Sequence, residues 1–195
     1  MRYILASKSP RRKEILQMLG LSFEVVTADT DESSEERDPT ALVRELSRRK
    51  GEAVRELLRT RGEDLDNTVI ISSDTVVAAE GEILGKPRDE EDACRMLRLY
   101  VGRTHRVVSG ICLIRGDRCA VSHEVTEVVF DDMTEEEIRT YVKEQKPYDK
   151  AGAYAIQGVA SAYIKEIRGD YFNVVGLPVH GLCKLYRENF GENIL

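Results

Sequence analysis

The sequence contains no tryptophan, only three histidines and only four cysteines in 195 residues. No two cysteines form a C-x-x-C pair, so the spacing typical of a structural zinc site is missing. The scarcity of histidine argues against a catalytic triad of serine, histidine and aspartate. Long apolar runs and a signal-peptide pattern are also missing. We therefore expect a cytoplasmic protein that binds no membrane.

The four cysteines are predicted to be free thiols. Cys112 and Cys119 flank an expected hairpin turn, which allows them to approach each other. In a reducing cytoplasm, however, free and partly buried thiols are favoured over a disulfide. Packing is therefore their expected role.

Neither sign of charge dominates: the chain has 29 basic and 35 acidic residues and a net charge of −6. This balance excludes a dedicated nucleic-acid binder, which would carry a basic face, and it makes any basic cluster a local feature. A chain of this length, with 42% hydrophobic residues, fits a single domain (1–195), and two lobes are compatible with it.

Apolar patterning predicts alternating strands and helices in the first half and hairpins in the second. That order indicates an α/β fold with a mixed sheet. We expect "TVIISSD" to be a buried strand that ends at Asp74, with a break before the next strand, and an acidic loop at 27–38. Helices are predicted over 10–19, 40–59, 89–100 and 134–145 and from 178; further strands over 3–6, 23–26, 75–84, 104–130 (a hairpin), 160–167 and 171–175.

The stretch "ILASKSPRRKEIL" (4–16) places four cations where a strand passes into a helix. Ser9 and a proline explain the helix start, but Arg11 and Arg12 then lie in the first turn, where the helix dipole disfavours cations. A bound polyanion would reverse that cost. The alternative is a solvated basic helix start, which fits Lys8 and Lys13 best.

Three further polar residues occupy positions that packing alone does not explain. Lys50 falls on the apolar stripe of its helix. It is either a functional cation that reaches into a cleft or a lysine at the edge of the stripe whose ammonium group reaches solvent. Asp74, at its expected strand end, either binds a hard cation or activates water, or it caps a turn. Lys86 precedes a proline just before a helix, which suits a phosphate as well as an ordinary surface.

The segment "DKAGAYAIQG" (149–158) combines small residues with Asp149, Lys150 and Gln157. Small residues allow the backbone to approach a ligand closely, and the polar side chains supply hydrogen-bonding groups. Its aromatic and aliphatic residues are unusual for a plain surface loop. A ligand site is therefore the favoured interpretation.

Together, "ILASKSPRRKEIL", "SSDTVV", "GKPRDEEDA", "YDKAGAYAIQG" and "VVGLP" resemble the Maf family of nucleoside triphosphate pyrophosphatases over essentially the whole chain. The resemblance implies a mixed twisted sheet with flanking helices, in an elongated two-lobed fold with a central cleft, similar to inosine triphosphate pyrophosphatases. It also implies an enzyme that hydrolyses a nucleoside triphosphate to a monophosphate and pyrophosphate. A divalent cation (Mg²⁺ or Mn²⁺) is the implied cofactor, and a homodimer is the implied assembly.

The resemblance also implies roles for individual residues. The complete "DKAGAYAIQG" run resembles the branch that acts on dTTP and UTP, whereas "SSDT" departs from the more frequent Gly-Ala before Asp-Thr. The implied proton acceptor is Asp74; the implied substrate-specificity residues are Arg11, Thr75 and Gln157; the implied phosphate-binding residues are Ser7, Arg12, Lys50 and Lys86; and the implied metal ligands are Glu32 and Asp74.

Several alternatives stay open at this point. Asp74 either deprotonates the attacking water or serves chiefly as a metal ligand that orients it, with Glu32 as its partner. The substrate is either a canonical or modified pyrimidine nucleotide, or a purine or other modified nucleotide. In another class of function, the chain is a nucleotide-sensing regulator of septum formation. The intact Asp74 and Lys86 motifs favour turnover over sensing.

Overall fold

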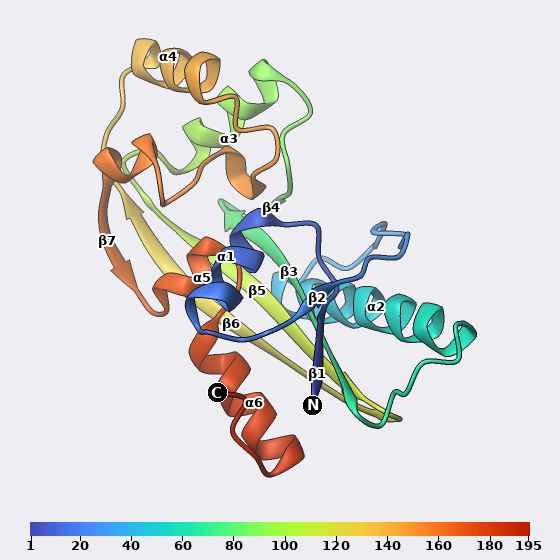
Figure 1. Cartoon of the computed structure of the whole chain (residues 1–195). Coiled ribbons are helices and arrows are strands. Elements are labelled where there is room, and N and C mark those ends of the chain that lie inside the picture. The colour runs from blue at the N-terminus through green and yellow to red at the C-terminus, as the bar shows by residue number, and fades with distance from the viewer.

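The computed structural model describes residues 1–195 and consists of one sheet with helices on both sides (Figure 1). The strands are β1 (Arg2–Leu5), β2 (Glu24–Val25), β3 (Thr68–Ala79), β4 (Glu82–Leu84), β5 (Thr104–Arg115), β6 (Arg118–Phe130) and β7 (Ile164–Arg168). The helices are α1 (Pro10–Met18), α2 (Pro39–Thr60), α3 (Glu90–Tyr100), α4 (Glu135–Gln145), α5 (Tyr171–Val175) and α6 (Val179–Phe190). Two 3₁₀ turns cover Ala151–Ala153 and Val159–Tyr163. None of the helices has the length and apolar character needed to cross a membrane.

The sheet has seven strands in the order β2-β1-β3-β5-β6-β7, and β4 pairs with β3. β1 runs parallel to β2 and β3. The remaining pairs, including the long β5–β6 hairpin, are antiparallel. The predicted α/β fold with a mixed sheet is confirmed.

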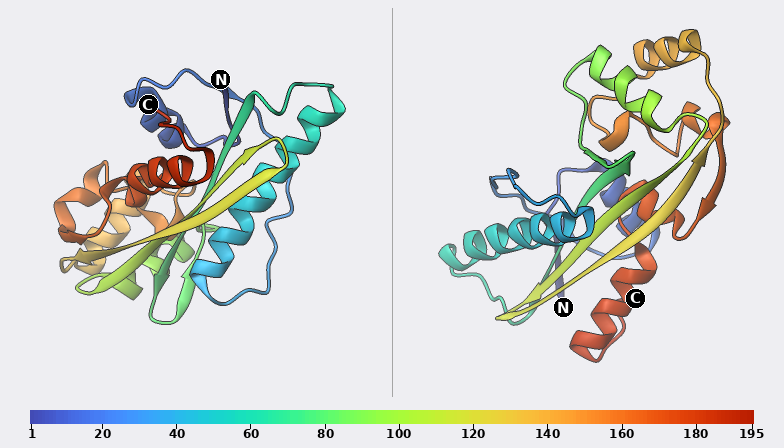
Figure 2. Two further views of the ribbon diagram at one scale, coloured as in Figure 1. Left: turned by 90° about the horizontal axis from the view of Figure 1, so that it is seen from below. Right: turned by 180° about the vertical axis from the view of Figure 1, so that it is seen from behind.

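Helices cover both faces of the half of the sheet that contains β1 (Figure 2). Val54 of α2 packs with Ile70 on one face, whereas Leu182 of α6 packs with Ile71 on the other. Ile70 and Ile71 are neighbours in β3, and consecutive strand residues point to opposite faces. The continuous apolar run of β3 therefore reflects a strand that is buried on both sides.

A separate apolar cluster fills the other end of the elongated molecule. There Val77, Val107 and Val128, from β3, β5 and β6, pack with Leu97 of α3 and Val142 of α4. Figure 1 shows α3 and α4 at this end, away from α2 and α6. The long central strands thus join two packed regions, and the residues between the regions belong to the same rigid strands.

Local capping fixes the helix starts that position the site. Ser9 Oγ accepts a hydrogen bond from the Arg12 backbone N–H at the start of α1. Thr134 and Glu137 form a capping box at the start of α4. The helix start that Ser9 and Pro10 predict is confirmed.

The predicted break after Asp74 is wrong. β3 continues without interruption from Thr68 to Ala79. Its antiparallel pairing with β5 holds every residue from Val69 to Ala78, and Asp74 lies opposite Gly110. A polar "SSDT" in a strand looks like a strand end in the sequence, but the hydrogen-bonded ladder extends through it.

The predicted strand over 171–175 is also wrong, because these residues form α5. Two adjacent valines favour a strand by propensity. The Asp170 side chain, however, accepts a hydrogen bond of 2.7 Å from the Phe172 N–H and caps a helical turn. The local cap outweighs the propensity.

Gly110 lets α2 lie directly on β5 beside Asp74. A Cβ atom at this position would overlap the carbonyl oxygen of Val43 in α2. We expect Gly110→Ala to lower the free energy of unfolding by about 3 kcal/mol, because a helix would have to move off the sheet. Urea unfolding measures the loss, and Gly85→Ala is the control, since no atom lies within 4 Å of a Cβ there. Equal stability of the two variants would contradict the close approach.

Candidate active site

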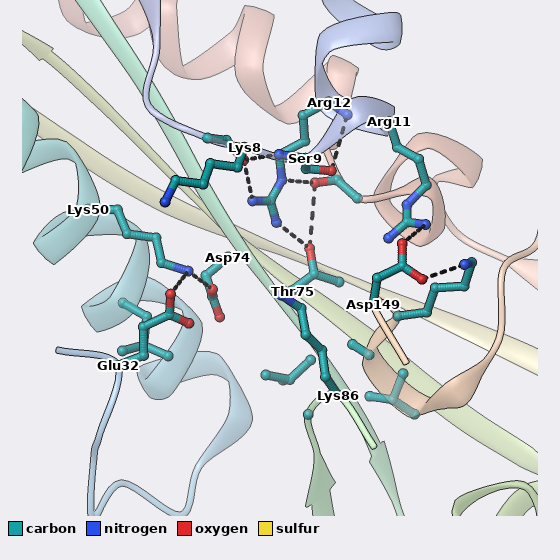
Figure 3. A pocket seen from close by; sticks show the side chains of 18 of the residues that line it. Lys8, Ser9, Arg11, Arg12, Glu32, Lys50, Asp74, Thr75, Lys86 and Asp149 are labelled. Carbon is teal, nitrogen blue, oxygen red and sulfur yellow. Dashed lines mark hydrogen bonds and ion pairs between the residues drawn. The ribbon is translucent and has the colours of Figure 1, made fainter. Parts of the chain in front are cut away.

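A cleft of about 830 Å³ opens between the two packed regions (Figure 3). It is lined by the turn between β1 and α1, the acidic loop, α2, the middle of β3, the residue pair after β4, the segment 149–157 and the end of α5. The structure brings all the candidate residues of the sequence to this one cleft: Ser7, Arg11, Arg12, Glu32, Lys50, Asp74, Thr75, Lys86 and Gln157. Their individual roles stay predictions.

An uncovered edge of β3 forms the back of the cleft. β1 covers this edge through Ile71, and β4 covers it again from Val77. The residues between these two contacts lack a neighbouring strand on that side, although β5 holds them on the other. The cleft thus lies past the carboxyl end of β1, where open α/β sheets bind ligands. The sequence analysis expected a ligand site beyond the end of β3, whereas the cleft lies beyond the end of β1.

Asp74 and Thr75 are consecutive and therefore point to opposite faces of β3. Asp74 contacts Lys50 of α2 on one face, and Thr75 contacts Arg12 of α1 on the other. The uncovered edge presents both side chains to the same cleft. Two separate polar groups, Lys50 with Asp74 and Arg12 with Thr75, are thereby brought to a single cleft.

On the α2 side, one ammonium group joins two carboxylates. Lys50 Nζ lies 2.6 Å from Asp74 Oδ1 and 3.1 Å from Glu32 Oε1. The Asp74 side chain is 11% exposed and that of Glu32 61%. The hydrogen bond from Lys50 engages Oδ1, so Asp74 Oδ2 is free to accept a hydrogen bond from water.

On the α1 side, Arg12 is fixed by three hydrogen bonds. It donates from Nη1 to Ser7 Oγ at 3.1 Å, from Nη2 to Thr75 Oγ1 at 3.1 Å and from Nε to the Gly176 carbonyl at 2.8 Å. Burial lowers the pKa of Arg12, and the guanidinium has no ion-pair partner in the protein. Arg12 is half-buried, and a cation that is partly removed from water and has no counter-ion is costly. The site is therefore suited to an anionic ligand.

Arg11 points to the opposite wall of the cleft. Its guanidinium lies 3.6 Å from Asp149 Oδ2, and Asp149 also accepts a hydrogen bond of 2.6 Å from Lys150. The backbone N–H of Gly152 donates to the Gly85 carbonyl at 3.0 Å, which ties this segment to the residue before Lys86. Arg11 thus connects the start of α1 with the segment 149–158.

Two exposed lysines complete the basic surface. Lys8 and Lys86 both line the cleft, and neither forms an ion pair within the protein. Figure 3 shows Lys8 on the same side as Lys50. The expectation of a solvated surface role holds for Lys13, which is exposed and does not line the cleft, but it missed Lys8.

The sequence also missed the groups that support Thr75. Its Oγ1 lies 2.8 Å from Ser109 Oγ, which in turn lies 3.3 Å from the Asn173 carbonyl oxygen. The Gly176 carbonyl that accepts from Arg12 belongs to "VVGLP". The sequence analysis identified this motif, but the group that it contributes is a backbone carbonyl oxygen. Every residue has such an oxygen, so the sequence does not reveal its role.

The unusual serines before Asp74 have partners of their own. Ser72 Oγ donates to the Ser47 carbonyl at 2.7 Å, and Ser73 Oγ donates to the Gly176 carbonyl at 3.4 Å. Both serines are fully buried. Their hydroxyls tie β3 to α2 and to the end of α5, and they make no hydrogen bond to the Asp74 carboxylate.

The donor set for a metal ion consists of two carboxylates. No group of three or more histidine, cysteine, aspartate or glutamate side chains is placed to hold a metal ion. Glu32 and Asp74 nevertheless converge on one cation, the Lys50 ammonium. Mg²⁺ is commonly bound by one or two carboxylates together with substrate phosphates. The two residues fit a cation that is shared with a phosphate ligand.

The model of the Maf-like protein family matches residues 2–189. The chain belongs to the Maf-like family. The family resemblance stated from the motifs is thereby confirmed, and it extends over the two packed regions and the cleft between them.

Relatives of this Maf-like chain share its full length. A protein of Thermoanaerobacter sp. (strain X514) named "dTTP/UTP pyrophosphatase" is 41% identical over all of both chains. One of Symbiobacterium thermophilum with the same name is 46% identical over 98% of this chain and 95% of its own. Among solved structures, the Ham1 protein of Staphylococcus aureus is 15% identical, with a TM-score of 0.48 over 68% of this chain and 73% of that chain.

Proposed function

We propose that the protein hydrolyses dTTP and UTP to the nucleoside monophosphate and pyrophosphate, with the help of a divalent cation. The chain belongs to the Maf-like family and is a nucleoside triphosphate pyrophosphatase, since its full-length relatives are named "dTTP/UTP pyrophosphatase". The preference for pyrimidine nucleotides and the need for a divalent cation are the parts that we propose. One observation supports the proposal most. The Asp74 carboxylate lines the same cleft as cations from three different segments, namely Arg12, Lys50 and Lys86.

Charge is the main requirement of the reaction. A triphosphate carries about four negative charges, and phosphoryl transfer is catalysed mostly by positioning and charge stabilisation. Arg12, in the helix that follows β1, and Lys86, two residues after β4, both line the cleft and supply positive charge. Arginine binds phosphate through paired hydrogen bonds and lysine acts as a point charge. Departing pyrophosphate would keep these contacts.

We propose that Asp74 orients the attacking water. Lys50 holds Oδ1 at 2.6 Å, and Oδ2 is left to accept a hydrogen bond from a water aimed at the α-phosphorus. The proton of that water would pass to Asp74 as the new P–O bond forms and the bond to pyrophosphate breaks. Glu32 and Asp74 would hold the divalent cation, which would neutralise phosphate charge when bound.

A nucleotide panel tests the proposed function. We expect UTP and dTTP to release pyrophosphate fastest, with the monophosphate as the other product, when Mg²⁺ or Mn²⁺ is present. Excess EDTA should lower these rates by at least about 10²-fold, because without the cation the carboxylates of Glu32 and Asp74 would repel the triphosphate. Chromatography of the products measures both. Fast release from purine nucleotides would contradict the pyrimidine preference, and tight binding without turnover would favour the regulator.

Gln157 is proposed to recognise the base. Its exposed side chain lines the cleft and makes no hydrogen bond within the protein. An amide both donates and accepts, as does the imide edge of uracil or thymine, whereas a carboxylate only accepts. We expect Gln157→Glu to lower the UTP/CTP ratio of kcat/KM by roughly 10-fold or more. Gln145→Glu is the matched control, because Gln145 is exposed at the end of α4 and does not line the cleft. An unchanged ratio with a lower overall rate would show that Gln157 does not recognise the base.

A further inference from the structure

Cys112 and Cys119 meet across the β5–β6 hairpin, on the side of the sheet that faces α2. Cys112 pairs with Val121 and Cys119 with Ile114, so the two cysteines are diagonal neighbours on antiparallel strands. Their Sγ atoms are 3.7 Å apart. The other two cysteines, Cys94 on α3 and Cys183 on α6, lie on different elements.

The two thiols differ in access to solvent. Cys112 is fully buried, and its Sγ would lie 3.4 Å from a Cβ placed at Gly51 of α2. Cys119 is exposed. A pair with one exposed and one buried thiol is suited to a reaction in which the exposed sulfur meets the oxidant and the buried sulfur resolves the product.

The surroundings of Cys119 favour its thiolate. The hydrogen bond with Cys112 lowers the pKa of Cys119 to about 7, and Arg48 and Arg55 of α2 act in the same direction, against burial and Glu52. The pKa of Cys112 is raised, first by the same hydrogen bond and then by burial. Cys112 is therefore the proton donor of the pair and Cys119 the nucleophile.

We propose that Cys112 and Cys119 are a redox-active pair, which a hydroperoxide converts into an intramolecular disulfide. The Cys119 thiolate attacks the peroxide oxygen, giving a sulfenic acid and hydroxide, or an alkoxide from an organic peroxide. Cys112 sulfur then attacks the Cys119 sulfur, and the S–O bond breaks. The Cys112 proton leaves with the displaced oxygen as water. With hydrogen peroxide, two thiols thus become one disulfide and two waters.

The geometry requires little rearrangement. A disulfide has an S–S bond of about 2.05 Å, so the two sulfurs approach by less than about 2 Å. Rotation of the exposed Cys119 side chain supplies most of that movement. None of the residues involved belongs to the candidate active site, so the proposal stands independently of the proposed function.

A peptide map of the intact protein tests the proposal. After about one equivalent of hydrogen peroxide, remaining thiols are alkylated and the protein is digested with trypsin without reduction. We expect two thiols per chain to be lost, and peptides 107–115 and 119–139 to be joined by a disulfide in a monomeric chain. Dithiothreitol should restore both thiols. Unlinked peptides, or a link between two chains, would overturn the proposal.

Two variants identify the order of the steps. In Cys112→Ser, Cys119 should stop at the sulfenic acid, which dimedone traps. In Cys119→Ser, Cys112 should resist the peroxide, because its thiol is buried. Cys183→Ser is the control and should form the disulfide as the chain without substitutions does. If Cys112→Ser fails to fold, the peptide map of the unmodified chain still decides, since it needs no variant.

Discussion

Asp74→Asn should lower the turnover of UTP by roughly 10²- to 10⁴-fold, the range expected when a positioned proton acceptor is lost. The variant keeps the size of the side chain and one oxygen that can accept from Lys50, so β3 and α2 should stay in place. It removes the negative charge that would take up the proton of water. A triphosphate should still bind, and removing a negative charge beside it should favour binding.

Three measurements separate these effects. Single-turnover rates give the loss in chemistry, equilibrium binding of UTP gives the affinity, and thermal unfolding shows whether the fold is intact. Asp117→Asn, in the β5–β6 turn with a side chain that is 98% exposed, is the matched control. Near-normal turnover of Asp74→Asn would exclude Asp74 as both proton acceptor and metal ligand.

Much of this site could be predicted because its residues violate packing rules. Lys50 was conspicuous as a cation on an apolar helix stripe, and it indeed reaches the cleft, with a side chain only 17% exposed. The buried side of α2 continues beyond Lys50 through Val54 and Leu58, whereas Ala53 and Leu57 are only partly buried.

Other features depend on contacts that a sequence does not show. The uncovered edge of β3 exists because its pairing with β1 ends at Ile71 and its pairing with β4 begins only at Val77. Neither endpoint has a residue signature. The helical turn of α5 likewise depends on one side-chain cap, at Asp170, against strand-forming neighbours. Long-range pairing and single caps therefore set the limit of the sequence-based interpretation.

Arg12 is the main cation on the α1 side of the cleft. A guanidinium has five N–H donors, and Arg12 uses three of them on Ser7, Thr75 and the Gly176 carbonyl. Those bonds hold the group in place without neutralising it, because all three acceptors are uncharged. Two donors and the full positive charge are left for a phosphate. The helix dipole of α1, which disfavours a cation here, favours the anion that would join it.

Arg12→Lys keeps the charge but replaces a fixed planar group with a flexible point charge. We expect kcat/KM for UTP to fall by about 10²-fold, because hydrogen bonds to charged groups contribute about 1.5–3 kcal/mol and more than one is lost. Lys13→Ala lies one residue further along α1, is exposed outside the cleft and should leave kcat/KM unchanged. Steady-state kinetics over a range of salt concentrations compares them. Equal kcat/KM for Arg12→Lys and the natural sequence would show that a positive charge alone is enough, and that Arg12 does not bind the phosphates through paired hydrogen bonds.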